Sequence, residues 1–217
     1  MLYVTLMLDI MLPMGDKIPT SPDHRCLFDV ASEQHGYFTA EQAHACDFRR
    51  YMLTHHTQQG RFIRIRRGLY RLRDYPSSPR EGVVVAWLAV GKKIAVVSHE
   101  SALDLLGLSD AIPQAVHITV PRSKRHLPVL SGVAIHTTTR PLGMQDATFR
   151  NGIRLTTATR TILDCAEAGT APEQVELAIT QAVERGLVTE ETLRQQSLSR
   201  GGRVAKIIAS ALERVRA

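Results

Sequence analysis

The residues of this sequence that are best placed to bind a ligand are arginines concentrated in one short segment. Residues 47–74 contain eight arginines and only two acidic residues, Asp47 and Asp74, for a net charge of +6. The whole chain of 217 residues has 27 basic and 21 acidic residues, so the remainder holds 19 of each sign. A guanidinium is always charged and donates two parallel hydrogen bonds to a phosphate. The distribution therefore predicts a binding site for a polyanion.

The cysteines and histidines predict neither a metal site nor a cofactor. Cys26, Cys46 and Cys165 are odd in number, far apart and in no metal-ligand spacing, so we expect three unpaired, buried thiols and a cytoplasmic protein. His55 and His56 are adjacent and lack a third ligand at helical spacing. The segment from His99 begins like a zinc-protease helix, but Leu103 stands where the second histidine would have to be.

The acidic residues do not indicate an enzyme. There is no glycine-rich phosphate loop and no nucleophile elbow, and Asp104, Asp110, Asp164 and Glu167 follow no nuclease-like pattern with a lysine. Arg160 and Asp164 are four residues apart on a predicted helix, which indicates a structural ion pair. We interpret the small basic segment with Arg122, Lys124 and Arg125 as a solvated loop. No catalytic residue is predicted.

The arginine-rich segment lies in a predicted helix-turn-helix. Asp23 can cap a first helix that ends at Gly36, and Thr39 with Gln42 matches a capping box for a short second helix over 40–45. A third helix is predicted over 48–58 and ends at Gly60. Three helices in this arrangement, with a tight turn before the last, are typical of a DNA-binding helix-turn-helix.

Residues 61–73 alternate between apolar and charged residues and predict a hairpin. Ile63 and Ile65 are expected on one face with Tyr70 and Leu72, and the arginines on the other. A hairpin after a recognition helix is the wing of a winged helix. Duplex DNA is favoured over RNA because aromatics, which stack on RNA bases, are only 5% of the chain.

The candidate DNA contacts come from the third helix and the wing. Phe48 and Leu53 are expected in the core, which leaves the polar residues of that helix on its open face. The predicted contacts on the helix are Arg49, Arg50, Tyr51, Thr54 and His55. Those on the wing are Arg61, Arg64, Arg66, Arg67, Arg71 and Arg73.

The sequence predicts an α+β protein with a winged helix-turn-helix over 21–75 and a mixed α/β domain over 80–217 that ends in helices. The linker, residues 74–80, is polar and contains two prolines. Residues 1–20 begin with an apolar stretch that lacks the basic flank and cleavage site of a signal peptide and is too short to cross a bilayer. We interpret them as a disordered or partner-binding extension.

Four segments together resemble the AbiEi-like antitoxins of type IV toxin–antitoxin (abortive infection) systems. They are GRFIRIRRGLYRL at 60–72, VSHESALDLLGL at 97–108, VHITVPRSKR at 116–125 and RLTTATRTILDCA at 154–166. The resemblance covers about residues 30–170. It implies a repressor that binds inverted repeats in its own promoter. It also implies a C-terminal domain that counters a nucleotidyltransferase-like toxin without a tight complex.

Two other functions stay open at this point. The chain can be a winged-helix transcription regulator with no toxin partner, or a nuclease that the winged helix targets to DNA. In each case a pair of chains is expected on a symmetric DNA site, because winged-helix repressors usually bind as dimers. No membrane association is expected.

Overall fold

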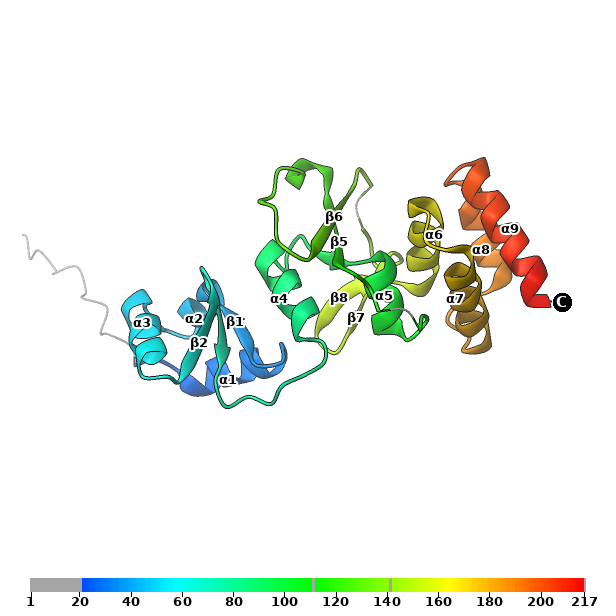
Figure 1. Ribbon diagram of the computed structural model, residues 1–217. Coiled ribbons are helices and arrows are strands. Elements are labelled where there is room, and N and C mark those ends of the chain that lie inside the picture. Colours follow the sequence, from blue (N-terminus) through cyan, green and yellow to red (C-terminus); the bar gives the residue numbers. More distant parts are fainter. Residues whose placement is uncertain (1–20, 111, 141, 217) are drawn as a thin grey trace, which may run out of the picture.

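The computed structural model describes residues 21–216 apart from Ala111 and Pro141, so the predicted extension over 1–20 lies outside the described residues. The described part of the chain begins with three helices and a small sheet (Figure 1). These elements are α1 (His24–Ser32), β1 (Tyr37–Thr39), α2 (Ala40–Ala45), α3 (Arg50–Gln58), β2 (Phe62–Arg66) and β3 (Leu69–Leu72). We call them the N-terminal module. The predicted helix-turn-helix and hairpin are confirmed, and β1 adds a third strand in the order β1-β3-β2.

Local signals set the helix ends as the sequence indicates. The Asp23 carboxylate accepts a hydrogen bond from the Cys26 backbone N–H (2.9 Å) and caps α1. Thr39 and Gln42 form the predicted capping box, with hydrogen bonds of 3.2 and 2.8 Å. α3 begins at Arg50, two residues later than expected, and Phe48 is buried just before it.

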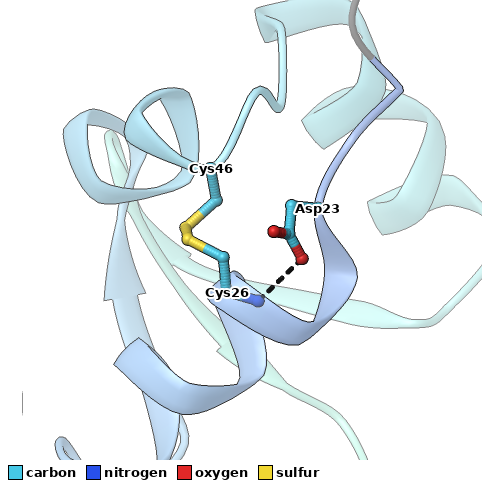
Figure 2. The surroundings of a disulfide bond; sticks show 3 residues. All are labelled: Asp23, Cys26 and Cys46. Carbon is cyan, nitrogen blue, oxygen red and sulfur yellow. Dashed lines mark hydrogen bonds between the residues drawn. A yellow bond between two sulfur atoms is a disulfide. The ribbon is translucent and has the colours of Figure 1, made fainter.

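A disulfide joins the first two helices, so the expectation of three unpaired cysteines is wrong for two of them. Cys26 near the start of α1 and Cys46 at the end of α2 are bonded, with their Cα atoms 5.7 Å apart (Figure 2). The two ends are already adjacent, because the Asp23 backbone N–H donates to the Cys46 carbonyl (3.0 Å). Cys165 is free and buried. A separation of 20 residues gives no local signal for such a pair.

A bulge in the hairpin overturns the predicted alternation of its side chains. Arg64 pairs with Tyr70, but Arg66 pairs with Leu69, so Ile65 is an extra residue on β2. One extra residue in a strand moves each later side chain to the opposite face of the sheet. Arg64 and Arg66 therefore lie on opposite faces. Ile65 is 38% exposed and does not join the apolar face.

Each face of the small sheet is covered by a different set of helices. Phe38, Phe62 and Tyr70 pack with Phe48 and Leu53 in the core beneath α1–α3. Tyr37 and Leu69, on the opposite face, belong to the core cluster that includes Val84 and Leu88 of α4 (Glu81–Val90). The N-terminal module therefore packs on α4 through its sheet.

The rest of the chain is a five-stranded sheet with helices, in the order β6-β5-β4-β8-β7. Its strands are β4 (Val96–Val97), β5 (Val116–Pro121), β6 (Val133–Thr138), β7 (Ala147–Arg150) and β8 (Ile153–Thr156). The helices after α4 are α5 (His99–Leu106), α6 (Ala158–Ala168), α7 (Pro172–Glu184), α8 (Glu190–Leu198) and α9 (Gly202–Arg216). This mixed architecture ending in helices confirms the predicted fold class.

Residues 73–80 between the two parts form neither helix nor strand. The Tyr75 hydroxyl donates to the Ser32 carbonyl (3.2 Å), which holds this segment against α1. A division into domains over 21–75 and 80–217 stays a prediction, because Tyr37 and Leu69 share a core with the second part. No helix among the described residues is long and apolar enough to cross a lipid bilayer.

Candidate nucleic-acid interface

The open face of α3 consists of polar and aromatic side chains. Leu53 and His56 are buried on its inner side. Every helix residue that the sequence predicted as a DNA contact is exposed: Arg49, Arg50, Tyr51, Thr54 and His55. Tyr51 is 66% exposed. The helix that carries it, α3, lies on the side of the small sheet away from α4 (Figure 1). The C-terminal sheet lies on the other side of the small sheet (Figure 1), so among the described residues this face is open to a duplex.

His56 supports α3 from within the core. Its ring centroid lies 4.9 Å from that of Phe62 and 5.7 Å from that of Phe48. Burial, together with the nearby His24, Arg61 and His55, lowers the pKa of His56. The ring is therefore a neutral packing group at neutral pH, while its neighbour His55 faces solvent.

Arginines of α3 and of the hairpin line one groove. The groove has a volume of about 400 Å³ and is lined by Arg50 from α3 and by Arg64 and Arg67 from the hairpin. Its floor includes Phe48, Leu53 and Tyr70, and its lining contains no acidic residue. Three arginines that line one groove, with no carboxylate in its lining, form a surface suited to a phosphate backbone.

The turn of the hairpin separates Arg67, which lines the groove, from Arg66, which does not. Gly68 has φ 76°, a conformation that favours glycine and permits the two-residue turn with Arg67. Arg66 is exposed but lies on the other side of the turn, where it lines a depression with Arg67, Leu88 and Leu127. Arg66 is thus directed toward the C-terminal part of the chain, away from the groove beside α3.

Arg61 and Arg73 are exposed at the base of the hairpin. The Arg73 backbone N–H donates to the Arg61 carbonyl (3.1 Å), and the Arg73 side chain donates to the Gly60 carbonyl. The Arg61 backbone N–H donates to the His56 carbonyl (2.9 Å), which places this pair beside the C-terminal end of α3. They extend the exposed positive charge to the far end of the hairpin.

Arg71 does not lie on the expected arginine face. It pairs with Tyr37 and Ile63 on the face toward α4 and is 8% exposed. Its guanidinium donates to the Tyr75 carbonyl (2.7 Å) and to the Glu81 carboxylate (3.2 Å). Arg71 is therefore a structural residue between the hairpin and α4, and we exclude it from the interface.

A second group of polar residues lies far from this surface and had no signal in the sequence spacing. The rings of His99, His117 and His136 come together from α5, β5 and β6. The predicted pair of Arg160 and Asp164 is confirmed at 2.8 Å and borders the same region. The residues are 18 and 19 positions apart along the chain, so only the fold brings the histidines together.

Three helices, the last exposed, followed by a hairpin define a winged helix-turn-helix, a fold typical of DNA-binding proteins. Residues 27–73 match the model of a family described as "Transcriptional regulator, AbiEi antitoxin", which confirms the resemblance over this part of the chain. No curated protein matches the chain.

Most of the chain is similar to a solved structure. It is similar to the crystal structure of the RV2827C protein from Mycobacterium tuberculosis, with a TM-score of 0.60 and 15% sequence identity. The similarity covers 92% of this chain and 79% of that chain. At this level of identity the likeness establishes a shared fold.

Proposed function

We propose that this protein is a sequence-specific DNA-binding transcriptional repressor that represses its own operon as the antitoxin of a type IV toxin–antitoxin system. The observation that carries the DNA-binding proposal is the groove in which Arg50, Arg64 and Arg67 converge from α3 and the hairpin. The match of residues 27–73 to an antitoxin regulator family supports the rest.

α3 and the hairpin would contact different parts of the DNA. α3 enters the major groove, where Arg49, Arg50, Tyr51, Thr54 and His55 reach base edges and flanking phosphates. Arg61, Arg64, Arg67 and Arg73 of the hairpin bind the sugar-phosphate backbone and fix the position of α3. An operator of inverted repeats would accept two chains related by twofold symmetry.

The antitoxin role is a more specific proposal than DNA binding. The toxin partner would be a nucleotidyltransferase-like protein, countered in the cytoplasm without a tight complex. The protein itself would have no catalytic activity. Co-expression with the neighbouring gene tests this part: rescue of growth supports an antitoxin. If that gene is harmless, or if its toxicity persists, the function reduces to transcription regulation alone.

DNA binding is tested by fluorescence anisotropy with the duplex upstream of the protein's own gene and a scrambled duplex of equal length. We expect the upstream duplex to bind at least about 1,000-fold more tightly, as for other specific regulators. Arg203→Ala, which removes an exposed arginine from α9, serves as the matched control and should bind like the unchanged protein. Equal affinity for both duplexes, or no binding at about 1 μM, contradicts the proposal.

A further inference from the structure

Three histidine side chains form a compact cluster between the start of α5 and the neighbouring strands β5 and β6. The His117 Nδ1 and His136 Nε2 atoms lie 3.0 Å apart. The His99 and His136 rings stack with their centroids 3.6 Å apart. One ligand nitrogen from each of the three rings falls within 4.8 Å of the others. Imidazoles gathered this closely offer three lone pairs to one ion.

The fold holds the three rings in place from independent elements. β5 and β6 are parallel, and His136 pairs with Thr119, two residues after His117, so both histidines project from the same face. His99 is the first residue of α5 and has φ 51°, a left-handed conformation that is rare for a residue other than glycine. Such strain persists only where the surroundings enforce it, and it is concentrated at functional sites.

The chemical state of the cluster suits a metal ligand. Burial lowers the pKa of His99 to about 3, and burial also lowers the pKa values of His117 and His136. All three rings are therefore neutral at neutral pH, the form in which imidazole binds a metal.

An outer hydrogen bond orients the most buried ring. The His99 Nδ1 atom lies 2.9 Å from the Ser98 hydroxyl, which in turn accepts a hydrogen bond from Thr119 (2.8 Å). With Nδ1–H donating to the Ser98 hydroxyl, the lone pair of Nε2 would be free to bind a metal, as in metal-bound histidines in general.

A cavity gives the cluster access to solvent. The cavity has a volume of about 480 Å³ and is lined by His99 and His136 together with Arg160, Asp164 and Arg200. The Asp164 carboxylate forms ion pairs with Arg160 (2.8 Å) and Arg200 (2.9 Å), so we do not count it among the metal ligands. An ion at the three histidines would therefore keep an open coordination position toward the cavity.

We propose that His99, His117 and His136 bind a transition-metal ion of the zinc type. Neutral imidazoles select Zn²⁺, Co²⁺, Ni²⁺ or Cu²⁺ over Mg²⁺ and Ca²⁺, which prefer oxygen ligands. Zn–N bonds of about 2.0–2.1 Å place tetrahedral ligands about 3.3 Å apart, close to the distance already present between His117 and His136. The ligand nitrogen of His99 lies within 4.8 Å of those of His117 and His136, so a small closure of the cluster would complete the site. Three protein ligands with an open fourth position are typical of zinc sites that bind water or an exogenous ligand.

Titration of the metal-free, untagged, full-length protein with Co²⁺ tests the site. The titration is done without thiol reductant, so that Cys26 and Cys46 stay paired and offer no thiolate. We expect one Co²⁺ per chain with a Kd below about 10 μM, visible absorption bands of a low-coordinate ion, and displacement by Zn²⁺. NMR of the imidazole nitrogens with Zn²⁺ should shift the signals of these three histidines alone.

Substitutions assign the ligands. His117→Gln and His136→Gln should each weaken Co²⁺ binding by more than the about 10- to 100-fold expected for Ser98→Ala, which removes only the outer hydrogen bond. His126→Gln, at an exposed histidine in the loop between β5 and β6, is the matched control and should bind as the unchanged protein does. Circular dichroism of the metal-free variants checks their folding. Absence of Co²⁺ binding to the unchanged protein, or unaltered affinity in both ligand variants, overturns the proposal.

Discussion

The Arg71 guanidinium on β3 and the Glu81 carboxylate at the start of α4 form an ion pair, with Nη2 and Oε1 3.2 Å apart. The Tyr37 hydroxyl donates to the other Glu81 oxygen (3.0 Å), so residues of β1, β3 and α4 share one polar contact. This contact lies on the face of the small sheet opposite α3. It fixes the position of the hairpin relative to α4 and leaves the groove beside α3 open.

Arg71→Ala should lower stability and leave DNA binding by the folded protein unchanged. The Arg71 side chain is 9% exposed, and its loss removes the donor to the Tyr75 carbonyl and the ion pair with the partly exposed Glu81 carboxylate. We expect a loss of about 2–4 kcal/mol in the free energy of unfolding, measured by urea denaturation. Arg66→Ala, an exposed change in the same hairpin, should stay within about 0.5 kcal/mol of the unchanged protein. Equal stability of the two variants would refute the structural role of Arg71.

Stability should fall in acid in part because of Glu81. Burial alone would raise the pKa of Glu81, but the Ser78 backbone N–H, the Tyr37 hydroxyl and Arg71 together lower it below the usual 4.5. A lowered carboxyl pKa means that the stabilisation is complete above pH 4.5 and is lost as the pH falls through the folded-state value. Urea denaturation across this range should show a shallower acid loss for Glu81→Gln than for the unchanged protein. Parallel curves would show that Glu81 does not contribute.

The bulge at Ile65 predicts different roles for two arginines that are only two residues apart. Arg64 faces the groove with Arg50, whereas Arg66 lies on the opposite face of the hairpin. Arg64→Ala should reduce the slope of log K against log salt for DNA binding by about one unit, because one phosphate contact is lost. Arg66→Ala should leave the slope unchanged. The same loss in both variants would show that the bulge does not direct Arg66 away from DNA.

Reduction of the disulfide should destabilise the N-terminal module. The bond closes a loop between residues 20 positions apart, and loss of such a constraint costs roughly 3 kcal/mol in the free energy of unfolding. Urea denaturation followed by Tyr fluorescence, with and without reductant, measures the effect. The double variant Cys26→Ser/Cys46→Ser should resemble the reduced protein and be insensitive to reductant. A protein whose unfolding is the same in both conditions would contradict this expectation.

Local signals in the sequence were sufficient for the elements that carry the interface. The capping box of Thr39 and Gln42 and the apolar positions of Phe48 and Leu53 depend on neighbours within a few residues, and all four lie as predicted. The turn between β7 and β8 is also local, because Asn151 and Gly152 adopt the positive φ angles (49° and 76°) that a two-residue turn requires.

Features that depend on distant parts of the chain could not be predicted in this way. The prediction that all hairpin arginines share one exposed face was wrong for two reasons. Alternation of residue type does not reveal a bulge. In addition, α4 covers the face of the sheet that holds Leu69 and Arg71. The Cys26–Cys46 bond and the histidine cluster arise when separate elements meet, and their spacing matches no local motif.

The most direct test of the DNA-binding surface is the salt dependence of affinity for the unchanged protein and for the triple variant Arg50→Ala/Arg64→Ala/Arg67→Ala. If the surface neutralises about six phosphates, log K against log salt should have a slope near −5, which should fall to near −3 when the groove arginines are removed. Circular dichroism should show an unchanged fold, because all three side chains are exposed. If the slope of log K against log salt is the same in both proteins, the proposal that α3 and the hairpin bind a duplex through this groove is contradicted.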